Sequence, residues 1–149
     1  MWLTADTLRN GAASGHYYEN YVVMELVKNY AYAKSKVNIT YFRDSNAKEI
    51  DVFIEENNVI HPLEIKKSAS PDRREVKKYS VIDKASLNRR NSGIICMCEE
   101  PIPIDKDNCF IPSNLIWITP IAKVYFQETK QSPKALLFVL VCPENDRKG

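Results

Sequence analysis

The sequence predicts an α+β domain (α/β in the broad sense), with a central mixed sheet flanked by helices, in the order helix, strand, strand, strand, helix, strand. Three patterns predict this class. Apolar residues recur at helical spacing through residues 15–33, apolar and polar residues alternate through residues 49–66, and residues 94–98 are wholly apolar. With 149 residues, of which 44% are hydrophobic and 27% charged, the chain is long enough and apolar enough to bury one core.

The first predicted helix covers residues 15–33. Its apolar stripe, at i, i+3 and i+4 spacing, consists of Val22, Val23, Leu26, Val27 and Tyr30. Glu19 lies on the same stripe, where a carboxylate is costly to bury without a partner. Two explanations remain open: Glu19 reaches solvent or the positive end of the helix dipole near the helix start, or it extends over the sheet edge toward Asp51 and Glu64.

Residues 37–43 form the first predicted strand, and residues 49–66 form a hairpin whose two strands are joined by Asn57-Asn58. Asn tolerates the positive φ that both central residues of a type I′ turn require. This two-residue turn sets three further pairs across the hairpin: Val52 with Leu63, Ile50 with Ile65, and Asp51 with Glu64.

Alternation assigns the side chains of the hairpin to two faces. The apolar face, which we expect to be buried, carries Ile50, Val52, Ile54, Leu63 and Ile65. The other face carries Asp51, Phe53, Glu64 and Lys66. Like charges directly opposite one another destabilise a sheet, so we expect a compensating group here, and a hard divalent cation with oxygen ligands is one candidate. An amphipathic hairpin with a solvated charged face is the alternative.

A second helix is predicted over residues 72–84, with Ser70 as its cap and Pro71 in its first turn. It is strongly basic, and its cationic side chains are Arg73, Arg74, Lys77, Lys78 and Lys84. Such a run is typical of a solvated helix face. Its position after the second hairpin strand also suits a surface that steers phosphates.

Three further segments complete the predicted fold. Residues 94–98 suit a buried interior strand, residues 99–108 a loop, and residues 114–119 a last short strand. The apolar run at residues 135–142 either adds an edge strand or is a tail without function.

The four cysteines lack the C-x₂-C spacing of a zinc site, so buried, reduced thiols are expected at Cys96, Cys98, Cys109 and Cys142. Cys96 and Cys98 lie two apart, and on a strand they point the same way.

Charge and hydropathy limit the partners of the chain. A net charge of +2, from 21 basic and 19 acidic residues, neither requires nor excludes nucleic acid. The longest apolar run has eight residues, against the ~20 needed to cross a bilayer. Because the N-terminus also lacks a secretory signal pattern, we expect a cytoplasmic protein with no membrane partner.

Asp51, followed on the adjacent strand by Glu64-x-Lys66, resembles the PD-(D/E)XK nuclease superfamily, whose shared restriction-endonuclease-like core has the element order predicted above. The resemblance implies that Asp51 and Glu64 hold Mg²⁺ or Mn²⁺, with the main-chain carbonyl of Ile65 as a further ligand. It implies that Lys66 assists the attacking water and that Glu19 completes the site directly or through water. The side chains expected to contact nucleic acid are Arg43, Lys67, Arg73, Arg74, Lys77 and Lys78.

Within this superfamily, the chain resembles one family in particular, the domain of unknown function 4143. The resemblance is carried by four segments, residues 15–26, 41–44, 49–51 and 63–68. That family is nuclease-like and usually forms the C-terminal part of AAA-type ATPases. The resemblance implies a nuclease-like domain at residues 15–118, after a lead-in at 1–14 and before a partly frayed extension at 119–149.

No Gly-x₄-Gly-Lys-Ser/Thr sequence occurs, so we expect no ATP site of the P-loop type in this chain. It resembles a detached piece of the family's usual architecture, with an ATPase domain or subunit as a partner in trans.

Two functions from different classes follow. The first is a metal-dependent nuclease that hydrolyses phosphodiester bonds of nucleic acid, with DNA favoured by analogy. The second is a catalytically silent module of the same fold that binds nucleic acid or a protein partner.

Overall fold

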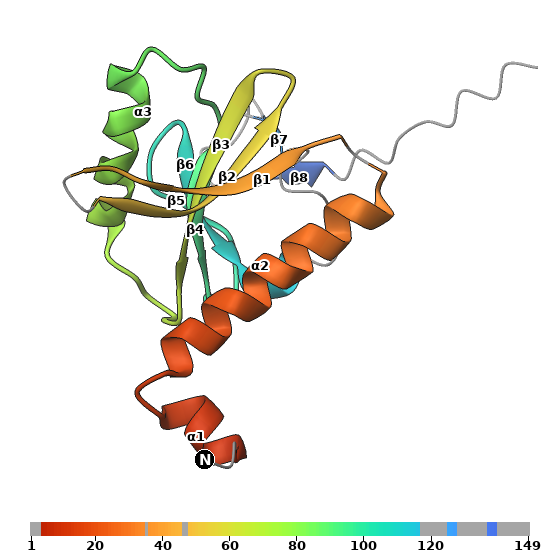
Figure 1. Ribbon diagram of the computed structural model, residues 1–149, viewed down its shortest axis with the longest axis vertical. Helices are drawn as coiled ribbons and strands as arrows, with labels where there is room; N and C mark the ends of the chain where they lie inside the picture. The colour runs from red at the N-terminus through yellow and green to blue at the C-terminus, as the bar shows by residue number, and fades with distance from the viewer. Residues whose placement is uncertain (1–3, 35, 46–47, 117–124, 128–136, 140–149) are drawn as a thin grey trace, which may run out of the picture.

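A six-stranded mixed sheet forms the core of the computed structural model, which describes residues 4–34, 36–45, 48–116, 125–127 and 137–139 (Figure 1). Its strands are β1 Asn38–Arg43, β2 Glu49–Glu56, β3 Val59–Lys66, β4 Ser92–Cys96, β5 Ile102–Pro103 and β6 Asn108–Pro112. Their spatial order is β1-β2-β3-β4-β6-β5. β1, β2 and β3 pair antiparallel, β3, β4 and β6 pair parallel, and β5 is antiparallel to β6. The predicted α+β class with a mixed sheet is therefore confirmed.

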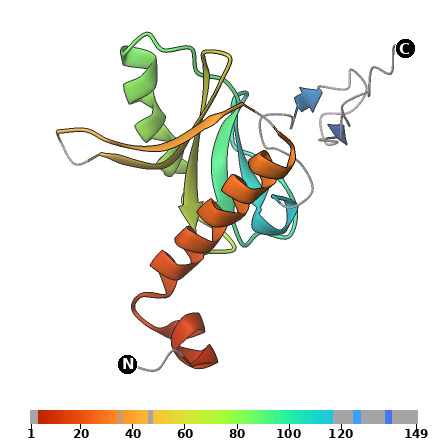
Figure 2. The ribbon, with the colours of Figure 1, turned by 45° about the vertical axis from the view of Figure 1, so that its right-hand side comes forward.

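Helical segments pack on both faces of the sheet, which lies between α2 and α3 in Figure 2. The long helix α2 (Ser14–Tyr32) forms one core cluster with β2, β3 and β4. The 3₁₀ helix η1 (Arg73–Tyr79) and the short helix α3 (Ser80–Lys84) form a second cluster on the other side. Neighbouring residues of β4 divide between the faces, since Ile95 joins the α2 cluster and Ile94 joins a cluster that includes Val76 of η1.

Helix α2 confirms the helical pattern. Its buried residues Val22, Leu26 and Tyr30 are spaced four apart, so they lie on one stripe facing the sheet. Val23 is half-buried against the same cluster. Val27, also expected on the stripe, is 41% exposed, because consecutive helix residues point about 100° apart and Leu26 faces the sheet.

A short helix, α1 (Ala5–Asn10), lies within the segment expected to be an irregular lead-in. Thr4 and Thr7 form a reciprocal capping box, in which Thr7 N donates to Thr4 Oγ1 (3.2 Å) and Thr4 N donates to Thr7 Oγ1 (2.9 Å). The Lys67 ammonium donates to the carbonyl of Arg9, which ties this helix to the end of β3. The helix has no buried residues, so hydrophobic periodicity could not predict it.

The predicted hairpin is confirmed in its strands, its turn and the first part of its register. Asn57 and Asn58 have φ of 53° and 62°, as a type I′ turn requires. Glu56 pairs with Val59, and the ladder continues to Val52 with Leu63.

Beyond Val52 the predicted register is wrong, because β2 contains a bulge. Thr40 of β1 pairs with Phe53 while Phe42 pairs with Ile50, so two steps along β1 match three along β2. The extra residue shifts the alternation of β2, and Ile50 packs with Tyr79 on the opposite side from Val52. In the described β2–β3 ladder, neither the pair Ile50 with Ile65 nor the pair Asp51 with Glu64 is present.

The helix predicted over residues 72–84 is present, but its N-terminal cap and its helix type differ from the prediction. Its cap is Asp72 rather than Ser70: Asp72 Oδ1 accepts a hydrogen bond from Arg74 N (2.8 Å). The segment runs as a 3₁₀ helix to Tyr79 and becomes α-helical only from Ser80. The buried hydroxyl of Tyr79 donates to the carbonyl of Gly93 (2.6 Å), which fixes this segment against β4.

The predictions after residue 91 are only partly right. Strand β4 begins at Ser92, two residues before the predicted start, and all five of its residues are buried, as expected between parallel neighbours. The segment predicted as a loop contains β5, and β6 starts at its end. Asp105 turns the chain into β6, since its carboxylate accepts hydrogen bonds from the main-chain N–H groups of Asp107 and Asn108.

The predicted last strand is wrong at its start, where η2 (Ser113–Leu115) forms a 3₁₀ turn; residues 117–119 lie outside the described ranges. Within the apolar run at 135–142, β8 (Leu137–Val139) pairs with β7 (Tyr125–Gln127) in a separate two-stranded sheet and does not extend the main one. The rest of that run is outside the described part.

The described cysteines are free thiols, as expected. Cys96 and Cys109 are buried and Cys98 is half-buried, while Cys142 lies outside the described residues. Burial raises the pKa of Cys98 and of Cys109 to about 12 in each case, which keeps both protonated and unreactive.

Among the helices of the described ranges, none has both the length and the hydropathy needed to cross a bilayer.

Candidate functional site

Glu64 is the most deeply buried charged residue of the hairpin and the centre of the candidate site. It lies in β3 between β2 and β4 and is 1% exposed. Successive side chains of a strand point to opposite faces of the sheet. Because Leu63 and Ile65 face α2, the side chain of Glu64 between them points to the face covered by η1. A carboxylate buried this deeply must be paired, since an isolated ionised carboxylate in a protein interior costs several kcal/mol.

Two lysines provide that pairing. Lys66 Nζ lies 2.6 Å from Glu64 Oε1, and the Lys78 ammonium forms an ion pair with Oε2. Oε2 nevertheless accepts no well-aligned hydrogen bond. Burial lowers the pKa of Lys66, but the hydrogen bond and the charge of Glu64 outweigh this and raise it overall. Lys66 is therefore an ammonium at neutral pH, as the sequence-based role requires.

Asp51 lies at the bulge of β2. There its carboxylate, rather than a main-chain carbonyl of β2, accepts a hydrogen bond from β3. Its Oδ2 accepts a hydrogen bond from the main-chain N–H of Ile65 (2.7 Å). Burial is the largest cause that raises the pKa of Asp51 to about 6, followed by the charge of Glu64. The hydrogen bond from Ile65 opposes this shift, and the charge of Glu19 adds a smaller increase. Asp51, Glu64 and the main chain of Ile65 therefore form one neighbourhood, although Asp51 and Glu64 are not a ladder pair.

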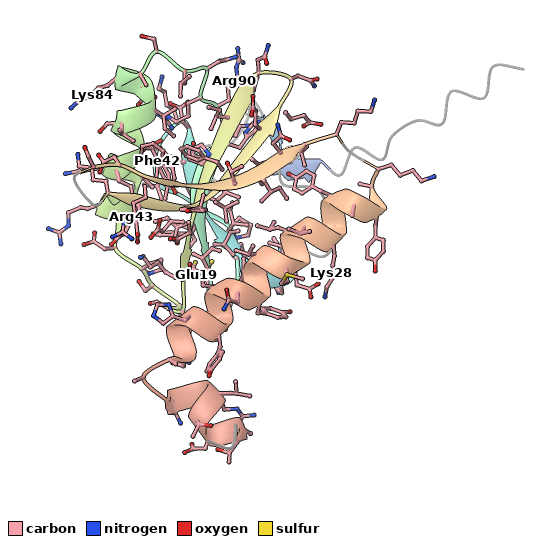
Figure 3. All side chains as sticks on the ribbon, in the orientation of Figure 1. Glu19, Lys28, Phe42, Arg43, Lys84 and Arg90 are labelled. Atoms are coloured by element: carbon pink, nitrogen blue, oxygen red, sulfur yellow. The ribbon has the colours of Figure 1, made fainter. Side chains whose placement is uncertain are left out.

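Glu19 lies in the first half of α2 (Figure 3), and its charge contributes to the raised pKa of Asp51. Its side chain is 42% exposed, and its Oε2 lies 3.8 Å from His16 Nδ1. In the described part of the chain, no three side chains of His, Cys, Asp or Glu form a ready metal-ligand group. The roles of Asp51, Glu64 and Glu19 as metal ligands therefore stay predictions.

Four of the six side chains expected to contact nucleic acid have partners within the chain, and the role of all six stays a prediction. Arg43 pairs with Glu49 across β1 and β2 at 3.0 Å, and Arg74 pairs with its own cap, Asp72, at 2.6 Å. The Lys67 ammonium donates a hydrogen bond to the carbonyl of Arg9, and the Lys78 ammonium forms an ion pair with Glu64. Arg73 and Lys77 are exposed on η1.

Three residues of the site environment were not assigned to it from the sequence: Lys78, Glu75 and Tyr79. Glu75 Oε2 lies 3.9 Å from Lys66 Nζ and 3.7 Å from Lys78 Nζ. Burial, followed by the charges of Glu64 and Asp51, raises the pKa of Tyr79 well above its usual value. The available signal was the Glu75/Lys78 pair three residues apart, which the strong basic character of the segment concealed.

Comparison with curated proteins and with solved structures gives no match. A family model, by contrast, matches residues 14–116, which is most of the chain and includes every residue of the candidate site. The chain belongs to the family described as Domain of unknown function (DUF4143).

Proposed function

We propose that this chain is a metal-dependent nuclease-like domain of the PD-(D/E)XK type, which hydrolyses phosphodiester bonds of nucleic acid, with DNA favoured. One observation carries the proposal. A buried carboxylate, Glu64, has Lys66 at 2.6 Å and raises the pKa of a second carboxylate, Asp51, which is itself hydrogen-bonded to the main chain of Ile65. Two interacting carboxylates with an ammonium, all partly shielded from water, are a combination often found at catalytic sites.

The arrangement of the strands supports the same proposal. An antiparallel hairpin is followed by a helical segment and a strand parallel to its second member, with α2 on one face and η1 and α3 on the other. This order resembles a restriction-endonuclease-like core. The bulge places Asp51 beside the main chain of Ile65, and bulges next to active sites commonly redirect a side chain in this way.

The donor set fits a hard divalent cation. Mg²⁺ is usually held by one or two carboxylates and keeps several waters, so Asp51 and Glu64 are sufficient side-chain ligands. Glu64 Oε2 is buried without an aligned hydrogen bond, but the Lys78 ammonium is paired with it, so a cation would have to compete with Lys78 for this oxygen. Asp51 and Glu64, with the carbonyl of Ile65, would hold Mg²⁺ or Mn²⁺, and Glu19 would join directly or through water.

The roles of the side chains follow from their charges. A bound divalent cation supplies a water of lowered pKa and a positive charge beside the phosphate. Lys66, held 2.6 Å from Glu64 Oε1, would orient such a water and would balance negative charge on the phosphate oxygens. Asp51 is held in place by the hydrogen bond that its Oδ2 accepts from the main-chain N–H of Ile65.

A calorimetric titration with Mn²⁺ tests the metal site, using the wild-type chain and Asp51→Ala side by side at pH 7.5. We expect one site per chain in the wild type and at least ~10-fold weaker binding in Asp51→Ala, which corresponds to about 1.4 kcal/mol. Equal binding isotherms would place the metal elsewhere and would contradict the proposal.

The silent binding module is the second candidate, and the two lysines at Glu64 favour it. Both carboxylate oxygens already have an ammonium partner, so the cluster is stable as a charge-compensated structure. In this case the partner would be nucleic acid or a protein, such as an ATPase domain or subunit supplied in trans. Retention of DNA by the chain with Mn²⁺, without any cleavage, would favour this module over the nuclease.

A further inference from the structure

Lys78 is a cationic residue at the site that the proposed mechanism does not use. Its side chain is only 20% exposed and extends from η1 to Glu64 Oε2, while Lys66 holds Oε1. Glu64 thus carries one ammonium on each oxygen. A buried carboxylate compensated in this way is stable before any metal arrives, but a cation can reach it only against two positive charges.

Glu75 offers Lys78 a second anionic partner. Its Oε2 lies 3.7 Å from Lys78 Nζ, and residues three apart on a 3₁₀ helix lie above one another, so η1 presents both on one side. Glu75 is also within 3.9 Å of Lys66 Nζ. Two carboxylates and two ammoniums therefore share one cluster, and a small movement of the Lys78 head group exchanges Glu64 for Glu75.

We propose that Lys78 is a built-in counter-ion that competes with a divalent cation for Glu64, and that Glu75 receives the Lys78 ammonium when the cation binds. This role rests on the metal site proposed above. Lys78 keeps the buried charge of Glu64 compensated in the metal-free chain, and at the same time it weakens metal binding. It is a positioning residue, because it acts on the cation through Glu64.

Calorimetric titrations of the full chain with Mn²⁺, at fixed pH and ionic strength, test this role. Lys78→Met keeps the aliphatic stem and removes the charge, so we expect Mn²⁺ to bind about 10-fold more tightly or better, since a +1 charge no longer opposes a +2 charge a few ångströms away. Lys78→Arg, which restores the charge, should return the affinity to within about threefold of wild type. The matched control is Lys84→Met, which removes a lysine from the far end of the same helical segment (Figure 3) and should leave the affinity unchanged.

Glu75→Gln provides an independent variant, because Glu75 is partly exposed and its loss should not unfold the chain. Without the second anion, Lys78 stays on Glu64, and Mn²⁺ should bind at least about threefold more weakly. Unchanged affinity in both Lys78→Met and Glu75→Gln, or weaker binding in Lys78→Met, would overturn the role of Lys78 while leaving the metal site intact. No Mn²⁺ binding by the wild type or any variant would overturn the proposed function, and with it this role.

Discussion

At the scale of single residues, Asp51 is a carboxylate whose charge state depends strongly on its surroundings. Its folded-state pKa is about 6, raised from 3.8 by burial first and by the charge of Glu64 second. The folded chain therefore holds this proton more tightly than the unfolded chain. The resulting contribution to stability is fully present below pH 3.8 and is lost as the pH rises through 6.

Asp51→Asn removes this titration and keeps an oxygen that can accept the hydrogen bond from Ile65 N. In metal-free buffer we expect the free energy of unfolding of Asp51→Asn to rise relative to wild type between pH 4 and pH 7.5. The gain should be about 1–2 kcal/mol, because each pKa unit is worth about 1.4 kcal/mol and the carboxylate is partly screened by solvent. Urea denaturation at several pH values measures it, and parallel pH profiles for the two proteins would contradict the assigned pKa.

At the scale of secondary-structure elements, the close approach of β4 and β6 is the strictest packing constraint in the described sheet. A Cβ built on Gly93 would lie 2.5 Å from the carbonyl oxygen of Cys109. The same Gly93 supplies the carbonyl that accepts the hydrogen bond from Tyr79. A single glycine therefore sets both the strand spacing and the anchoring of η1, the segment that carries Lys78.

Gly93→Ala should therefore destabilise the chain by about 3 kcal/mol or more, because main-chain atoms of two buried strands must separate. Gly15→Ala is the matched control: nothing lies within 4 Å of a Cβ at Gly15, near the start of α2. There we expect no loss, and a gain of up to about 1 kcal/mol from helix propensity. Thermal and urea unfolding of both variants would measure this, and a Gly93→Ala variant as stable as wild type would show that β4 and β6 are spaced differently.

The elements also show where the sequence was informative. Helix α2 and the hairpin were predictable because the apolar residues of each recur at a regular spacing. The hairpin also has a turn whose two Asn residues have the required backbone conformation. The bulge at Asp51 was not, since alternation assumes one residue per step on both strands. Strand β6 was missed because a five-residue buried strand that begins with Asn108 and ends with Pro112 has no alternation to detect.

At the scale of the whole molecule, the site depends on contacts that no local pattern contains. The sequence placed Asp51, Glu64 and Lys66 in one neighbourhood through the hairpin alone. Lys78 and Glu75 reach the site only because η1 packs on the sheet face that carries Glu64. That packing depends on the hydrogen bond between Tyr79 and Gly93 of the parallel strand β4. Long-range packing therefore completes a site that local pairing begins.

We propose that Asp51, Glu64 and Lys66 form a metal-dependent nuclease site. Its most direct test is cleavage of end-labelled single- and double-stranded DNA by the purified chain with Mn²⁺, with EDTA as the blank. We expect Mn²⁺-dependent phosphodiester cleavage by the wild type and none in EDTA. Cleavage by Asp51→Ala and by Lys66→Met should be at least about 100-fold slower. No cleavage by the wild-type chain, or equal cleavage by Asp51→Ala, would contradict it.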